Sequence, residues 1–151
     1  MKRFSLLLLI GAAITACQHT GNSHQAGSNA IDGSDTDTAA WVTFSGTLPC
    51  ADCNGIVTEL SLEMQPPNAI HHFRLKETYL GKNQAFPSEG IYKVLHGVPA
   101  NHGATVIQLN PDRDKNLQRY FQRVGKNELK MLDRDQQQIK SNLNYTLKKV
   151  Q

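Results

Sequence analysis

The feature that most constrains the fold is an alternation of apolar and polar residues, which recurs from Trp41 onward between turn residues. It is clearest in segment 56–64, where apolar side chains share one side of an extended chain and polar ones the other: Ile56, Leu60, Leu62 and Met64 against Glu59, Ser61 and Glu63. A period of two residues is typical of a strand with one buried face. The pattern therefore predicts a strand, with Met64 in the core.

Similar segments follow one another along the chain, and none of them shows a helical period. The expected strands cover 42–47, 56–64, 70–79, 91–96, 104–109, 117–124 and 129–133, with a last one through Leu143, Tyr145 and Leu147. The intervening segments read as a loop at 81–90 and as turns at 66–68, 97–103, 110–115, 125–127 and 134–138. Seven or eight short antiparallel strands predict an all-β fold. We favour a small barrel, because a closed ring leaves no exposed strand edge.

The first sixteen residues have the composition of an export signal, with basic Lys2 and Arg3 before an apolar run at 6–13. The run is too short for a spanning helix, which needs roughly 20 apolar residues. The ending Ile14-Thr15-Ala16-Cys17 resembles the lipobox of bacterial lipoproteins. That resemblance implies cleavage after residue 16 and acyl chains, palmitate among them, on Cys17. Several acyl chains hold a protein durably on a membrane.

Residues 17–40 are rich in Gly, Ser, Asn, Thr and Asp, so we expect a lipidated tether before a folded domain at 41–151. In lipoproteins of this kind Gln18, rather than an aspartate, after the cysteine implies sorting to the outer membrane, on its periplasmic face. His19 and His24 read as solvated residues of the tether. The formal net charge of +3 falls to +1 when Lys2 and Arg3 leave with the signal, so nothing favours nucleic-acid binding.

With Cys17 lipidated, Cys50 and Cys53 remain as the candidate functional residues. Outside the inner membrane such a pair usually forms a disulfide, here worth only about 2 kcal/mol because few residues are enclosed. Two thiolates also suit Cu(I), whereas a structural zinc needs two further ligands. The available donors do not show zinc-site spacing: Met64, His71, His72, His96 and His102. A thioredoxin-like enzyme is disfavoured, because a strand rather than a helix follows the pair.

One stretch resembles the cysteine-pair signature of the NlpE N-terminal domain family: Phe44-Ser-Gly-Thr-Leu-Pro-Cys-Ala-Asp-Cys-Asn-Gly-Ile-Val-Thr-Glu-Leu-Ser-Leu62. Further matches follow in the family's order at Tyr79-Leu80, Phe86 with Gly90, 106–110 and 129–133. The resemblance implies a lipocalin-like barrel with the cysteines near the turn between its first strands. It also implies copper tolerance and a partner in envelope-stress signalling. Longer family members add a second β-domain.

Three hypotheses follow, and the thiol oxidoreductase disfavoured above is the third of them. The first is a non-enzymatic outer-membrane lipoprotein whose barrel presents a redox-responsive or Cu(I)-responsive pair, Cys50 and Cys53. The second is a lipocalin-like carrier, in which the barrel interior holds an apolar ligand and the cysteines only pin a loop. The second hypothesis requires an interior that side chains leave empty, since ligand pockets run to roughly 300 Å³ or more.

Overall fold

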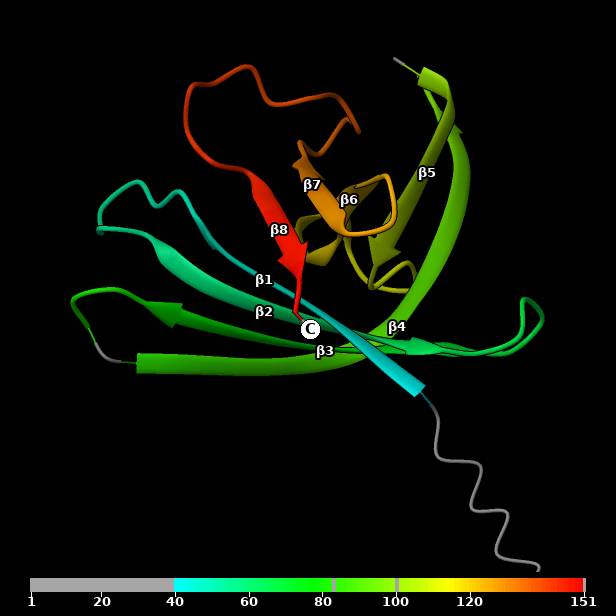
Figure 1. Ribbon diagram of the computed structural model, residues 1–151, viewed down its shortest axis with the longest axis horizontal. Helices are drawn as coiled ribbons and strands as arrows, with labels where there is room; N and C mark the ends of the chain where they lie inside the picture. Colours follow the sequence, from blue (N-terminus) through cyan, green and yellow to red (C-terminus); the bar gives the residue numbers. More distant parts are fainter. Residues whose placement is uncertain (1–39, 83, 100, 151) are drawn as a thin grey trace, which may run out of the picture. The chain divides into compact units, whose positions relative to one another are not determined.

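The structure, a computed structural model, describes residues 40–82, 84–99 and 101–150. Eight antiparallel strands form a closed barrel in chain order (Figure 1), which confirms the all-β barrel prediction. The strands are β1 (Ala40–Leu48), β2 (Ile56–Met64), β3 (His71–Tyr79), β4 (Gln84–Val98), β5 (Asn101–Leu109), β6 (Arg119–Val124), β7 (Glu128–Leu132) and β8 (Thr146–Lys149). The expected signal, Cys17, His19 and His24 lie outside the described residues.

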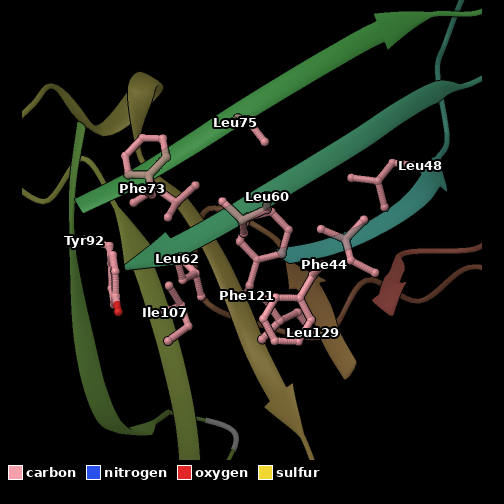
Figure 2. Packing of buried hydrophobic residues seen from close by; sticks show 12 residues of the cluster. Phe44, Leu48, Leu60, Leu62, Phe73, Leu75, Tyr92, Ile107, Phe121 and Leu129 are labelled. Carbon is pink, nitrogen blue, oxygen red and sulfur yellow. The ribbon is translucent and has the colours of Figure 1, made fainter. Parts of the chain in front are cut away.

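The centre of the barrel is filled by side chains. One cluster draws buried residues from every strand: Phe44, Leu48, Leu60, Leu62, Phe73, Leu75, Tyr92, Ile107, Leu109, Phe121, Leu129 and Leu147. Figure 2 shows these side chains converging from facing strands. The middle of the barrel therefore leaves no compartment for an apolar ligand, and the carrier hypothesis stays a prediction only for the cavities at the barrel's ends. All of these residues lie within 40–150, so that part of the chain contains the strands and the core that joins them.

Strands β5, β6 and β7 are also buried on their outer face. A second cluster contains Val106, Tyr120 and Leu132, which alternate with residues of the first cluster along the same strands. Strands covered on both faces read as continuous apolar runs rather than as alternation. This burial explains the adjacent apolar pairs Val106-Ile107 and Tyr120-Phe121.

Strand β4 corrects the prediction of a loop at 81–90. It begins at Gln84 and pairs with β3 in continuous register from Tyr79↔Gln84 to His71↔Tyr92. Most side chains of its first half are exposed, so no alternation marks it, and backbone pairing holds it instead. Its pairing with β5 begins only at Tyr92, and the carbonyl of Ile91 accepts a hydrogen bond from the N–H of Asn110, which leaves 84–90 with one unpaired edge among the described residues. Pro87 and Glu89 on this edge are residue types that discourage pairing with another chain.

Smaller corrections concern side chains near the strand ends. The last strand covers only Thr146–Lys149, and Leu143 is exposed in the loop before it. Leu117 is exposed in the short helical segment η1 (Lys115–Leu117) rather than in β6. Met64 is 48% exposed rather than in the core, because β2 ends there, at the rim of the barrel. In the described part of the chain no helix is long and apolar enough to cross a membrane.

The barrel has two distinct ends (Figure 1). The β1–β2 loop with its cysteines and the β3–β4 turn lie at one end, and the β2–β3 turn and the start of β1 lie at the other. The register confirms this arrangement, because Leu48 pairs with Ile56 at the cysteine end and Ala40 pairs with Met64 at the opposite end.

A pH-sensitive contact joins β2 to β3 on the outside of the barrel. The His72 ring lies 2.7 Å from the Glu63 carboxylate, and this hydrogen bond, with help from Gln65, lowers the pKa of Glu63 below its usual 4.5. A carboxyl whose pKa is depressed by folding stabilises the protein above its unfolded pKa, and that contribution is lost as the pH falls through the folded pKa.

We therefore expect His72→Ala to lower stability at pH 7, where the Glu63 carboxylate gains from this contact, and to approach the stability of the wild type as the pH falls through the folded pKa of Glu63. The loss of stability in acid is then smaller in the variant. Urea unfolding measured across this pH range is the check. Lys76→Ala, which breaks the more exposed Lys76–Glu59 pair, is the control. An unchanged pH profile in the His72 variant would contradict the assignment.

Candidate functional site

The cysteine loop spans residues 49–55 and is set by the residues at its two ends. Pro49 has no backbone N–H, so the ladder with β2 stops after the pair Leu48↔Ile56. Gly55 closes the loop at φ +138°, a conformation that favours glycine. A Cβ there would lie 2.7 Å from Thr47 Cγ2, so a larger residue also meets a steric barrier.

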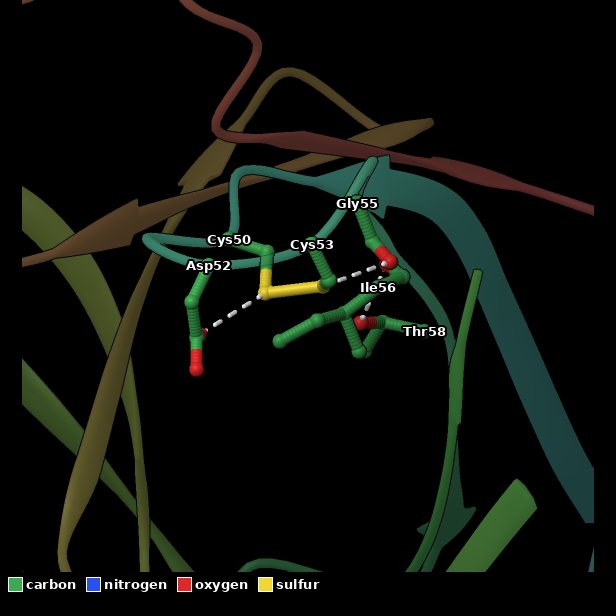
Figure 3. The surroundings of a disulfide bond; sticks show 6 residues. All are labelled: Cys50, Asp52, Cys53, Gly55, Ile56 and Thr58. Atoms are coloured by element: carbon green, nitrogen blue, oxygen red, sulfur yellow. Dashed lines mark hydrogen bonds between the residues drawn. A yellow bond between two sulfur atoms is a disulfide. The ribbon is translucent and has the colours of Figure 1, made fainter. Parts of the chain in front are cut away.

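Cys50 and Cys53 are joined by a disulfide (Figure 3), one of the two states predicted for the pair. Their Cα atoms are 5.3 Å apart, which is an ordinary separation for a bridge. Both cysteines are partly exposed, and their neighbours Ala51, Asp52 and Asn54 are exposed. The bridge is therefore accessible to reagents in solution rather than enclosed in the core.

Each sulfur lies beside an oxygen atom. Sγ of Cys50 is 3.7 Å from Oδ1 of Asp52, and Sγ of Cys53 is 3.3 Å from the carbonyl oxygen of Gly55 (Figure 3). Disulfide sulfurs carry no hydrogen, so these contacts become hydrogen bonds only when the bridge is reduced and each thiol gains a proton. In the reduced state, each thiol therefore has an oxygen atom nearby that can accept its hydrogen bond.

The base of the loop is held firmly. The carbonyl of Gly55 accepts a 2.9 Å hydrogen bond from the N–H of Leu80, which links the loop to the β3–β4 turn. The hydroxyl of Thr58, fully buried, donates to the carbonyl of Ile56 at 3.2 Å. An exposed tip on a fixed base is the arrangement expected of a site that reacts without unfolding the barrel.

The other candidate metal ligands lie away from the cysteines. Met64 ends β2 eight residues after Ile56, and His71 begins β3 eight residues before Tyr79, the partner of Ile56. Each lies roughly 26 Å along its strand from the base of the loop, at the rise of a strand. His96 lies near the tip of the β4–β5 hairpin and His102 at the start of β5, both exposed. His72 pairs with Glu63. Among the described residues no cluster of three or more His, Cys, Asp or Glu is arranged to hold a metal.

The cysteine pair on its own can do two things chemically. It can cycle between disulfide and dithiol, and as a dithiol it can offer two soft sulfur ligands, which suit Cu(I) at low coordination number. Tetrahedral zinc needs further ligands from the chain. The separation of the histidines from the loop means that the described residues do not supply them there.

An ion pair that the sequence did not predict lies inside the barrel, near the end that carries the cysteine loop. Glu77 of β3 and Arg119 of β6 form a double hydrogen bond, at 2.6 and 3.0 Å. They line a cavity of about 440 Å³ together with Leu48, Pro49 and Ile56 of the loop's base. One signal was present in the sequence: Glu77 follows Phe73 and Leu75 at a spacing of two, which places a carboxylate on the inward face of β3.

Removing the bridge should cost little stability. The variant Cys50→Ser/Cys53→Ser is expected to lower the free energy of unfolding by about 2 kcal/mol, because so short a loop restricts the unfolded chain only slightly. Urea unfolding of the variant, and of the wild type with and without a dithiol reductant, measures this. Unfolding of the variant, or of the wild type with the reductant, would mean that the barrel needs the bridge to fold.

The comparisons with known proteins agree with this geometry. The family model of the NlpE N-terminal domain matches residues 44–142. Lipoprotein NlpE of Escherichia coli (strain K12) is 33% identical over 109 residues, which cover 72% of this chain but only 41% of that protein. No solved structure matches the chain significantly. The match of the domain model over most of the chain, cysteine loop included, shows that this protein belongs to the NlpE lipoprotein family.

Proposed function

We propose that this protein is an outer-membrane lipoprotein, anchored through Cys17 and facing the periplasm, whose cysteine loop responds to copper and to the redox state of the envelope. The observation that carries the proposal is the place of the Cys50–Cys53 bridge. It lies on an accessible loop with a fixed base and encloses few residues, so we expect the barrel to stay folded without it. A bridge placed in this way can open while the fold persists.

The response begins with reduction of the bridge. A dithiol donor supplies two electrons and two protons, the S–S bond breaks, and the donor leaves as a disulfide. The two thiols of Cys50 and Cys53 then donate to Asp52 and to the Gly55 carbonyl. On binding Cu(I) both thiols lose their protons, and two thiolates hold one cation in a complex with one net negative charge.

The proposal predicts that the reduced protein binds one Cu(I) per chain and that the oxidised protein binds none. The measurement is an anaerobic titration in competition with a chromogenic Cu(I) chelator. We expect the reduced wild type to take copper from the chelator and Cys50→Ser/Cys53→Ser to leave it there. Met64→Leu/His96→Gln, which removes a thioether and an imidazole at the far end of the barrel, should behave as wild type. Equal binding by the wild type and the double-serine variant would refute the copper part.

Copper tolerance and envelope-stress signalling are proposed at the level of the cell, and the family membership is their support. The alignment spans less than half the length of Lipoprotein NlpE. If this domain is sufficient for signalling, its partner would have to bind the barrel or the cysteine loop. The double-serine variant, expressed in place of the wild type, tests this. Loss of copper tolerance or signalling would assign that role to the bridge, and its retention would assign it to the barrel alone.

A further inference from the structure

The end of the barrel opposite the cysteine loop contains a cavity of about 590 Å³. It opens where β2 ends and β3 begins, and β4, β5 and β6 contribute the rest of its wall. Tyr92 and Ile107, which both belong to the buried core, close it toward the centre of the barrel. Its volume lies within the range of small-molecule sites, roughly 300–1,000 Å³.

Large apolar side chains gather at this cavity without being covered. Met64 is 48% exposed, Ile70 is 68% exposed and Val94 is 39% exposed, and all three line it. Single exposed apolar residues are common on protein surfaces, but several on one concave site mark a place that binds apolar matter. Part of the ligand is therefore expected to be hydrocarbon.

The charged side chains that line the cavity are basic. Lys93 and Arg123 line it together with His71 and His96, and none of the described lining residues is acidic. Neither Lys93 nor Arg123 makes an ion pair or a side-chain hydrogen bond within the described part of the chain. Burial raises the pKa of Tyr92, the positive charge of Arg123 opposes that shift, and the negative charge of Glu63 adds to it. An anionic group is the matching partner.

A polar atom at the same site also lacks a partner. Nδ1 of His71 is buried and is the one such side-chain nitrogen or oxygen in the described residues without a hydrogen bond. The ring lies against Tyr92, with 5.0 Å between the ring centres. The Tyr92 hydroxyl cannot serve as donor to His71, since it donates to the Glu63 carbonyl at 2.7 Å. Protein atoms cover this nitrogen, so an anionic head group in the cavity would pair with Lys93 or Arg123 instead.

We propose that this cavity binds a single-chain amphiphile with an anionic head group. The head lies toward Arg123 on β6, and the alkyl chain lies against Met64, Ile70 and Val94 on the side of the β2–β3 turn and β4. Two sources share this chemistry, free fatty acids and anionic lysophospholipids. The site does not involve the cysteine pair, so its test is independent of the copper proposal.

The test uses residues 18–151, which contain every described strand and lack the Cys17 acyl chains that would compete. A dansyl-labelled fatty acid is bound and then displaced by palmitate, by palmitoyl lysophosphatidylglycerol or by uncharged monopalmitoylglycerol, each below its micellar concentration. Butyrate serves as an anion without a long chain. We expect displacement by at least one of the two long-chain anions, monopalmitoylglycerol roughly tenfold weaker, and no displacement by butyrate.

Matched variants assign the binding to the cavity. Arg123→Gln should weaken the anionic ligands about tenfold and leave monopalmitoylglycerol unchanged, because a hydrogen bond to a charged group is lost. Ile70→Ser should weaken all long-chain ligands severalfold. The controls are Lys126→Gln in the β6–β7 turn and Leu143→Ser, both exposed positions outside the cavity, and both should bind as wild type. Unchanged thermal unfolding of all four variants shows that they are folded.

Displacement by palmitate alone would identify free fatty acids as the ligand, and displacement by the lysophospholipid alone would identify phospholipid. Displacement by both supports the shared chemistry. The proposal is overturned if neither anion displaces the probe. It is also overturned if monopalmitoylglycerol competes as well as the anions, or if Arg123→Gln and Ile70→Ser bind like their controls.

Discussion

Replacing Phe121 by alanine is expected to lower the free energy of unfolding by about 3–5 kcal/mol, the largest effect of any single change considered. Phe121 lies on the inward face of β6, is fully buried, and belongs to the cluster that draws side chains from every strand. Truncation removes its apolar contacts and leaves a cavity where the rigid barrel cannot collapse to fill the space. Urea unfolding followed by circular dichroism gives the value.

The matched control is Phe86→Ala, the same chemical change at an exposed position of β4. Phe86 meets Tyr79 edge to face, with 5.4 Å between ring centres, so a loss of up to about 1 kcal/mol is expected. If Phe121→Ala does not fold, Phe121→Leu should still show a loss of about 1–2 kcal/mol. Similar losses at the two phenylalanines would contradict the burial that the barrel assigns to Phe121.

Breaking the interior ion pair is the second large effect. In Arg119→Met the Glu77 carboxylate, nearly buried, loses both of its hydrogen bonds and its counter-charge. Removing one partner of a fully buried pair costs about 3–5 kcal/mol. Because about a third of the Arg119 side chain reaches solvent, we expect a smaller loss, about 2–3 kcal/mol.

The double variant Glu77→Leu/Arg119→Met tests the reason for that loss. With both charges gone, no unpaired carboxylate remains, so most of the stability should return. A double-mutant cycle measured by urea unfolding gives the coupling energy. Lys76→Met, at the exposed pair with Glu59, is the control and should change stability by less than about 1 kcal/mol. A double variant as unstable as Arg119→Met would show that packing, not the stranded charge, causes the loss.

Much of the fold was predictable from local pattern. The alternation in β2 and β3 predicted both strands to within a residue, since one face of each packs on the core and the other meets solvent. The first half of β4 was not predictable in this way. Its side chains are exposed on both faces, so they show no alternation. It is a strand because its backbone pairs with β3, and the residues at 84–90 do not by themselves predict that pairing.

The two ends of the barrel differ in how far the sequence anticipates their chemistry. The cysteine loop is a local feature: Pro49, Cys50, Cys53 and Gly55 lie within seven residues, so the pair can be recognised in the sequence, and the expected export signal favours a bridge between its members. The far cavity gathers Met64, Val94 and Arg123 from three strands that are distant along the chain. Met64 illustrates the difference. The two-residue period of β2 correctly predicted that its side chain lies on the inward face, but its exposure follows from its position at the rim of the barrel.

The sequence by itself determined that the chain is all-β, that it carries an accessible pair of cysteines between its first two strands, and that it resembles the NlpE family. These properties rest on residues close together in the chain, where alternation, turn chemistry and motif spacing act directly. The tertiary structure alone decided that Glu77 meets Arg119 across the interior and that apolar and basic residues share a cavity at the opposite end. The physical reason is closure of the barrel: inward side chains from strands that are not neighbours meet only once the last strand pairs with the first.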